Sequence, residues 1–149
     1  MKYQYRYLKA TLIFCLIGFF IPGFTAILLL GIQILLTKIG MECANSWKLI
    51  WTGTWIGMIL SPILFFRYLN GKSTVPYKKI KTNLILFNLF EYIFVQASLA
   101  SLFTNGNTLC YGSGGQNGIE FAFTAWLALP ILIIFSYFFF FFSETTIAE

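Results

Sequence analysis

Glu91 is the only acidic or basic residue deep inside the four long apolar stretches of this sequence. A carboxylate near the middle of a bilayer costs several kcal/mol, so the side chain should face other helices or a wet cavity. At about 100° per residue, Asn88 and Ser98 fall on nearly the same helical face as Glu91, with Gln96 further round. This polar stripe could bind a proton or a cation, or line a path for a solute.

The alternative role for the stripe is structural. A neutral Glu91 could hydrogen-bond to Asn88 or to another span and so join helices. We favour this interpretation because proton relays in membranes usually contain a second acid or a histidine.

The residue inventory argues against an enzyme. The chain has no histidine and no aspartate, which excludes a Ser-His-Asp triad, a histidine-based metal site and a pair of catalytic aspartates. Its five acids are all glutamates, and only Glu91 lies in a low-dielectric setting. The three cysteines form no Cys-x-x-Cys motif for a thiol relay. We therefore expect no catalytic site, no metal and no cofactor.

A ridge of small residues runs along the second apolar stretch. Gly53, Gly57 and Ser61 recur at every fourth position, a spacing that lets another helix approach closely. The pattern is common in membrane helices, so it predicts close packing without naming the partner. Packing inside the monomer is favoured over homodimerisation.

Two of the cysteines are candidates for a disulfide. Cys43 and Cys110 fall in the two loops predicted on the outer side of the membrane, whereas Cys15 lies inside the first apolar stretch. In an oxidising compartment, a Cys43–Cys110 bridge would tie the two outer loops together. Both loops are short enough to allow this, although spacing alone does not prove the connectivity.

These residues need a membrane-embedded scaffold. Hydrophobic residues make up 58% of the 149 residues and charged residues only 10%, against about 25% charged in a typical soluble domain. Four apolar stretches are each long enough to cross a bilayer as a helix. The sequence thus predicts an all-α integral membrane protein with one four-helix domain over residues 1–149 and short loops. The predicted spans are about 10–36, 49–66, 82–104 and 119–142.

The first span is longer than a bilayer requires. At about 1.5 Å per residue it exceeds a core of about 30 Å, so it should tilt or bend. Pro22 and Gly23 in its middle predict a kink at that point.

Charge predicts the orientation of the spans. Eight of the ten basic residues lie in the N-terminal segment and in the 67–81 loop, while the 37–48 loop has two and the 105–118 loop has none. This asymmetry predicts that both termini are cytoplasmic. It also explains the net charge of +5 without a nucleic-acid partner.

The aromatic residues agree with this orientation. Trp47, Trp51 and Trp126 fall at the predicted outer interface and Tyr68 at the inner one. Trp47 and Trp51 also repeat with Trp55 along one face, which indicates a belt extended inward, or alternatively an aromatic wall for a ligand.

Two functions are compatible with these features. The first is a non-catalytic protein of a bacterial inner membrane that binds another membrane protein or itself, as immunity, exclusion and assembly proteins of this size do. The second is a small proton- or cation-coupled transporter or channel subunit centred on Glu91. Four spans are few for a monomeric transport path, and we see no inverted repeat, so the first function is favoured.

Overall fold

The computed structural model describes residues 4–22, 24–70, 74–111, 119–142 and 146–148. These ranges hold six helices and two short strands. They are α1 (Gln4–Phe20), α2 (Phe24–Lys38), α3 (Cys43–Asn70), β1 (Thr74–Pro76), α4 (Tyr77–Phe103), α5 (Gly106–Tyr111), α6 (Ile119–Phe142) and β2 (Thr146–Ala148). Three helices, α3, α4 and α6, are long and apolar enough to cross a membrane, or four spans exist if α1 and α2 count as one bent crossing. The predicted helical membrane architecture is confirmed at this level.

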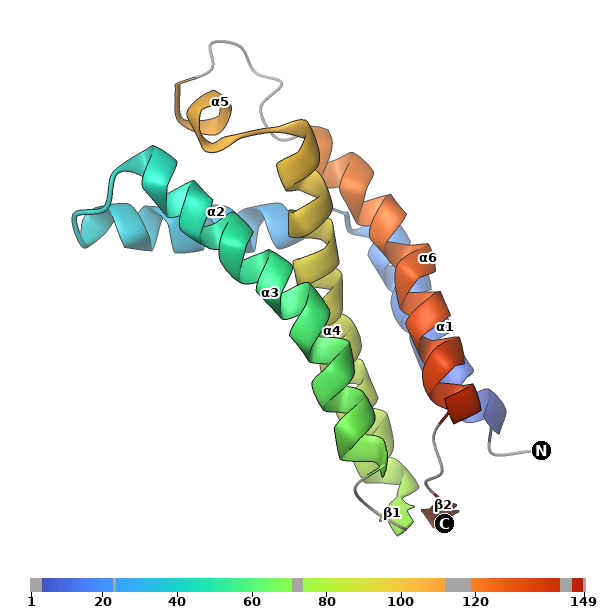
Figure 1. Cartoon of the computed structure of the whole chain (residues 1–149). Helices are drawn as coiled ribbons and strands as arrows, with labels where there is room; N and C mark the ends of the chain where they lie inside the picture. Colours follow the sequence, from blue (N-terminus) through green and yellow to red (C-terminus); the bar gives the residue numbers. More distant parts are fainter. Residues whose placement is uncertain (1–3, 23, 71–73, 112–118, 143–145, 149) are drawn as a thin grey trace.

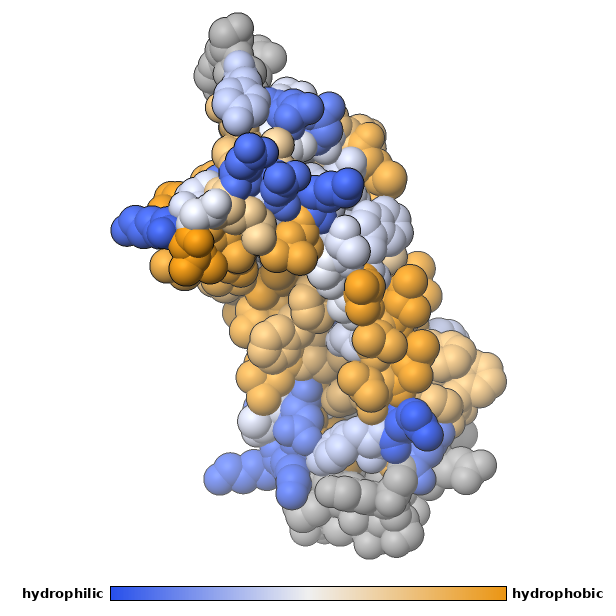
Figure 2. All heavy atoms as spheres, turned by 60° about the vertical axis from the view of Figure 1, so that its left-hand side comes forward, coloured by the Kyte–Doolittle hydropathy of each residue, from blue (hydrophilic) through white to orange (hydrophobic). Residues whose placement is uncertain are grey.

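Figure 1 shows α1, α3, α4 and α6 running along the molecule, with α2 lying across them. At one end of the molecule β1 pairs in parallel with β2. The start of α1, the last turn of α3, the start of α4 and the end of α6 lie at this same end. The opposite end carries α5 and the start of α3. Figure 2 shows hydrophilic side chains gathered at these two ends and apolar surface between them, as a membrane protein requires.

The first predicted span is two helices. The axes of α1 and α2 differ by 75°, and the break lies at the predicted kink, although Gly23 itself is outside the described residues. In a bilayer the backbone groups freed by such a break need partners. Two side chains supply them: the indole Nε1 of Trp126 donates to the Phe19 carbonyl at 3.2 Å, and the Gln96 amide donates to the Pro22 carbonyl at 3.4 Å.

Helix α2 has a buried face that packs against the bundle and an exposed face of aliphatic side chains. Thr25, Leu29 and Gln33, spaced four residues apart, are buried. Aliphatic side chains face outward instead, with Ile27 75% exposed and Leu35 64% exposed. An outward face of aliphatic side chains is favoured where the surroundings are apolar.

Three buried clusters form the core along the length of the bundle. The cluster nearest the β strands is aromatic and joins α3, α4 and α6; the middle one joins α1, α4 and α6; the third joins α2, α3 and α4 below α5. Helix α4 contributes to all three. This central position buries more of α4 than of the other long helices and so shelters the polar stripe of the sequence.

Candidate functional site

The four predicted residues of the polar stripe are all inside the protein. Asn88, Glu91, Gln96 and Ser98 of α4 each have 0% of their surface exposed. The prediction that Glu91 turns away from lipid therefore agrees with the structure. The four side chains do not form one continuous site, however, because their hydrogen bonds lead to different elements of the fold.

Asn88 takes part in a polar connection between three helices. Its Nδ2 donates to Thr11 Oγ1 of α1 at 3.1 Å, and Thr11 Oγ1 donates to Ser136 Oγ of α6 at 3.0 Å. The three residues are buried. This is the helix-joining role expected of the stripe, but Asn88 performs it, whereas the sequence predicted Glu91 in that role. Sequence reasoning missed Thr11 and Ser136, since one hydroxyl in an apolar span carries no signal of its partner.

Glu91 is the unusual member of the stripe. Both carboxyl oxygens are buried and have no hydrogen-bond partner, and the same is true of the neighbouring Asn88 Oδ1. The Ser61 side chain of α3 approaches the carboxyl, but not with the geometry of a hydrogen bond. No ion pair involves Glu91 within the described ranges. A buried polar group without a hydrogen bond lowers the stability of the folded protein, so the position of Glu91 needs a chemical explanation.

Gln96 and Ser98 belong to another environment, one to two turns along α4. Gln96 bonds to the Pro22 carbonyl at the helix break. The Ser98 carbonyl accepts a bond from Ser101 Oγ, which itself accepts one from the indole of Trp55 at 2.9 Å. Trp55 thus joins α3 to α4.

The small-residue ridge of α3 is used on part of its length. A Cβ at Gly57 would lie 2.8 Å from ring carbons of Phe94 on α4, so only glycine permits this approach. Ser61, one turn further along α3, approaches Glu91 of α4. A Cβ at Gly53 would meet nothing within 4 Å. Within this chain, the ridge therefore packs against α4 at Gly57 and Ser61, while Gly53 lies outside the contact.

The cysteines build a compact cap at the α5 end of the molecule. Cys43 at the start of α3 and Cys110 in α5 form a disulfide, with their Cα atoms 6.1 Å apart. The amide of Gln33 in α2 donates to Cys43 Sγ at 3.1 Å. We call α5 with the start of α3 the cap. The predicted pairing is present and links α3 to α5, while the Gln33 hydrogen bond adds a contact from α2.

A close glycine contact completes the cap. A Cβ at Gly106 would lie 2.9 Å from both the Ala44 carbonyl oxygen and Trp47 Cβ, so α5 rests directly on the backbone of α3. Asn105 caps α5, accepting a bond from the Thr108 backbone N–H at 2.9 Å. This short helix was not predicted. The Asn105-Gly106 pair is equally typical of a turn, and a helix of six residues depends on tertiary contacts such as the disulfide and the contact with Trp47.

Alkylation of the unreduced protein tests the cap. In denaturant, we expect Cys43 and Cys110 to resist a thiol reagent until a reductant is added. Cys15, the free cysteine of the described residues, should react without reductant. Peptide mass spectrometry before and after reduction measures this, and Cys15→Ser identifies the free-thiol signal. Free alkylation of Cys43 and Cys110 in the unreduced protein would contradict the disulfide.

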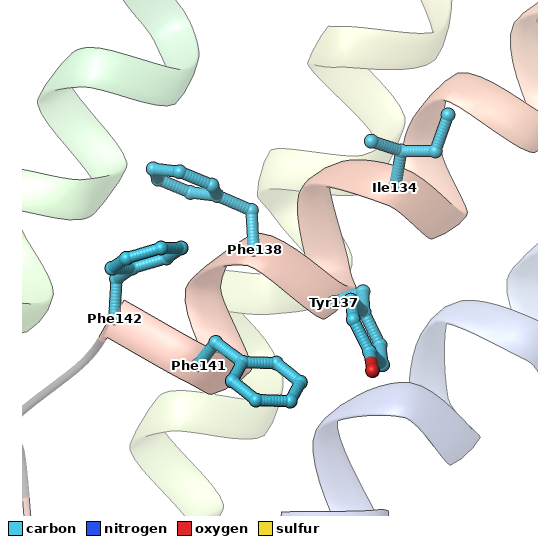
Figure 3. A pocket seen from close by; sticks show the side chains of 5 residues that line it. All are labelled: Ile134, Tyr137, Phe138, Phe141 and Phe142. Atoms are coloured by element: carbon cyan, nitrogen blue, oxygen red, sulfur yellow. The ribbon is translucent and has the colours of Figure 1, made fainter.

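The hollows on the surface are apolar. Figure 3 shows one of them, of about 240 Å³, lined along α6 by Ile134, Tyr137, Phe138, Phe141 and Phe142. Such a lining suits a lipid chain, and the hydroxyl of Tyr137 is its one polar side-chain group. Among the residues that the structure describes, no three or more His, Cys, Asp or Glu side chains lie close enough together to hold a metal ion.

The described residues thus give two features for a functional argument, the buried Glu91 on α4 and the disulfide-bonded cap. They belong to a helical membrane protein, and comparison with family models, curated proteins and solved structures finds no match to this chain.

Proposed function

We propose that this protein is a small, non-catalytic, multi-pass protein that binds another membrane protein through its cap. The observation that carries the proposal is the fixing of α5 on α3 by the Cys43–Cys110 disulfide and the Gly106 contact. A surface held rigid before binding loses less conformational entropy on association, which favours recognition.

The chemistry of the cap surface supports a protein partner. Asn107, Thr108 and Tyr111 are exposed on α5, with Tyr111 73% exposed. A neutral polar surface with a prominent tyrosine is typical of protein interfaces. Helix α5 itself has no basic residue for nucleic acid or anionic lipid, and the nearest described basic residue along the cap is the exposed Lys48 of α3. The partner is another membrane protein or a second copy of this chain.

The proposal includes an orientation and a location. We place four crossings in the bilayer, with α1 and α2 as one broken crossing and both termini in the cytoplasm. The basic residues support this, since Lys9, Arg67, Lys78, Lys79 and Lys81 lie on the elements that meet at the β-strand end. The cap then faces an oxidising compartment, as its disulfide needs, which fits the outer side of a bacterial inner membrane.

A second candidate function rests on one observation. The unpartnered carboxyl of Glu91 could serve a small proton- or cation-coupled transporter or channel subunit. The two oxygens have almost no accessible surface in this structure, so a transport path would need a second conformation or an oligomer. Partner binding is favoured because the cap is already accessible in this conformation.

Photo-crosslinking in the native membrane tests the proposed function. With a photoreactive residue at Tyr111, we expect one stoichiometric adduct, and about a tenfold lower yield when Cys43 and Cys110 are both serine, because α5 then loses its attachment. Gel mobility and mass spectrometry identify the adduct. Glu91→Gln, a neutral isostere, should leave the yield unchanged.

The control probe stands at Ile63, which is 49% exposed on α3, away from the cap. Equal yields of the same adduct from Ile63 and Tyr111, or no specific adduct from Tyr111, would overturn cap-mediated binding. Loss of biological activity in Glu91→Gln with an unchanged adduct would favour the transporter function.

A further inference from the structure

The interior next to Glu91 contains more hydrogen-bond acceptors than donors. Three buried oxygens, the two of Glu91 and Oδ1 of Asn88, have no donor. One of the two N–H groups of the Asn88 amide is given to Thr11, and the other makes no hydrogen bond to Glu91. The approaching Ser61 hydroxyl could supply at most one donor. A deprotonated Glu91 would leave at least two acceptors unsatisfied in a low-dielectric interior, which is strongly unfavourable.

No described side chain supplies a compensating positive charge. In the helices that contact α4, the basic residues lie near the helix ends: Lys9 in α1, Lys38 in α2, Lys48 and Arg67 in α3, with Lys78, Lys79 and Lys81 at the start of α4 itself. Residues 122–142 of α6 contain none. The other titratable side chains within the described interior of the bundle are Cys15 and Tyr92, and the Cys15 thiol already donates to the Leu129 carbonyl.

We propose that the Glu91 carboxyl and the Asn88 amide oxygen form a binding site for a single exchangeable proton. A proton taken from water forms an O–H bond on one carboxyl oxygen, and its release returns it to water with no other bond changed. The acid can then donate to Asn88 Oδ1, three residues back on the same face of α4. One proton thereby removes the buried negative charge and gives a donor to an acceptor that lacked one.

A metal cation fits this site less well. Hard cations such as Ca²⁺ and Mg²⁺ take about six to eight oxygen ligands, several of them waters where the protein provides few. Glu91, Asn88 and Ser61 together offer four oxygens, and the carboxyl oxygens are closed to solvent. A proton needs only one acceptor beyond the carboxyl itself. The donor set therefore favours a proton.

The structure also indicates how the proton reaches water. Pro62 lies inside α3 next to Ser61 and has no backbone N–H, so the carbonyl four residues earlier lacks its helical partner. Helix α3 is consequently weakest beside Glu91. Bending of α3 at this point would uncover the carboxyl while α1 and α6 stay joined to α4 through Asn88, Thr11 and Ser136. This site is independent of the cap and of the proposed partner binding.

A membrane-permeant carbodiimide tests the proposal, because it adds to protonated carboxyl groups in apolar surroundings. In purified protein in liposomes, we expect a single adduct at Glu91 whose yield falls about tenfold for each pH unit above its midpoint. Replacing choline by Na⁺ at constant ionic strength should leave the yield unchanged. Glu91→Gln should abolish the adduct, and Glu42→Gln, at the start of α3, should not.

Infrared spectroscopy of the same liposomes gives an independent readout. In a difference spectrum between neutral and alkaline pH, where the other glutamates stay ionised, the native protein should lose the carbonyl stretch of a protonated carboxylic acid, and Glu91→Gln should show no such change. Protection of Glu91 by Na⁺ would overturn the proposal in favour of a metal-cation site. A carboxylate band at all pH values, or an acid band that never responds to pH, would overturn it as well.

Discussion

Phe139→Ala should be among the most damaging substitutions in this protein, while Phe141→Ala, two residues away on α6, should have little effect. Phe139 is 1% exposed, and its ring centroid lies 5.0 Å from that of Phe65 on α3 and 5.1 Å from that of Phe87 on α4. Truncation would leave a cavity where three helices meet. Phe141 is 60% exposed and faces lipid.

The size of the effect depends on the solvent. In water-soluble cores, Phe→Ala costs about 3–5 kcal/mol, made up of a transfer term and a cavity term. In a bilayer the transfer term is small because lipid chains are as apolar as the core, so mainly lost packing remains. We expect Phe139→Ala to lower the free energy of unfolding by about 2–3 kcal/mol, and Phe141→Ala by less than about 0.5 kcal/mol.

Reversible unfolding in bicelles by titration with a denaturing detergent measures both values. Each variant carries the same Phe→Ala change on the same helix, so differences in helix propensity and in detergent binding cancel. Equal losses for the two variants would mean that the aromatic cluster does not hold α3, α4 and α6 together, and would contradict the packing described for this end of the molecule.

Gly57→Leu is expected to separate α3 from α4, with Gly53→Leu as its matched control. Even a Cβ at Gly57 would lie 2.8 Å from ring carbons of Phe94, whereas Gly53 has open space around it. Replacing glycine by leucine raises helix propensity by up to about 1 kcal/mol at both sites. Overpacking at Gly57 should outweigh this gain and leave a net loss of about 1–3 kcal/mol.

The two glycine variants also decide between the two uses of the small-residue ridge. The same detergent titration, combined with the molar mass of the protein–detergent complex, gives stability and oligomeric state together. Packing inside the monomer predicts that Gly57→Leu is destabilised and Gly53→Leu is not, with the mass unchanged in both. A larger effect of Gly53→Leu, or a change of mass in that variant, would show instead that the ridge holds a second copy.

These predictions concern the scaffold, and they matter for both functional proposals. The contact of Gly57 with Phe94 places Ser61 beside Glu91 on the same pair of helices. The cap depends on a different set of contacts, those of Cys43, Cys110 and Gly106. A variant that loosens α3 against α4 should therefore change proton exchange at Glu91 before it changes partner binding at the cap.

Part of this structure could be predicted from the sequence, because the constraint behind it is simple. A bilayer requires long apolar helices with satisfied backbones, and a residue such as Glu91 inside one of them must turn towards the protein. The same reasoning predicted the break after α1 from Pro22 and Gly23, since proline removes a backbone donor. The Cys43–Cys110 pair followed from a count of cysteines in two short loops.

Other features depend on how the helices meet, and a helix pattern contains no such information. The 75° bend that lays α2 across the bundle is stabilised by Trp126 and Gln96. Thr11 and Ser136 join Asn88 because three helix faces converge there. The six-residue helix α5 exists because a disulfide and one glycine contact hold it.

Glu91 shows the division most clearly. Its sequence position determined that a carboxyl would be buried in the membrane, because the apolar residues on both sides fix its depth. Whether that carboxyl would find partners was decided by the tertiary structure alone. Asn88 donates to Thr11 and Thr11 donates to Ser136, and the Glu91 oxygens are left without a hydrogen bond in the interior of the bundle.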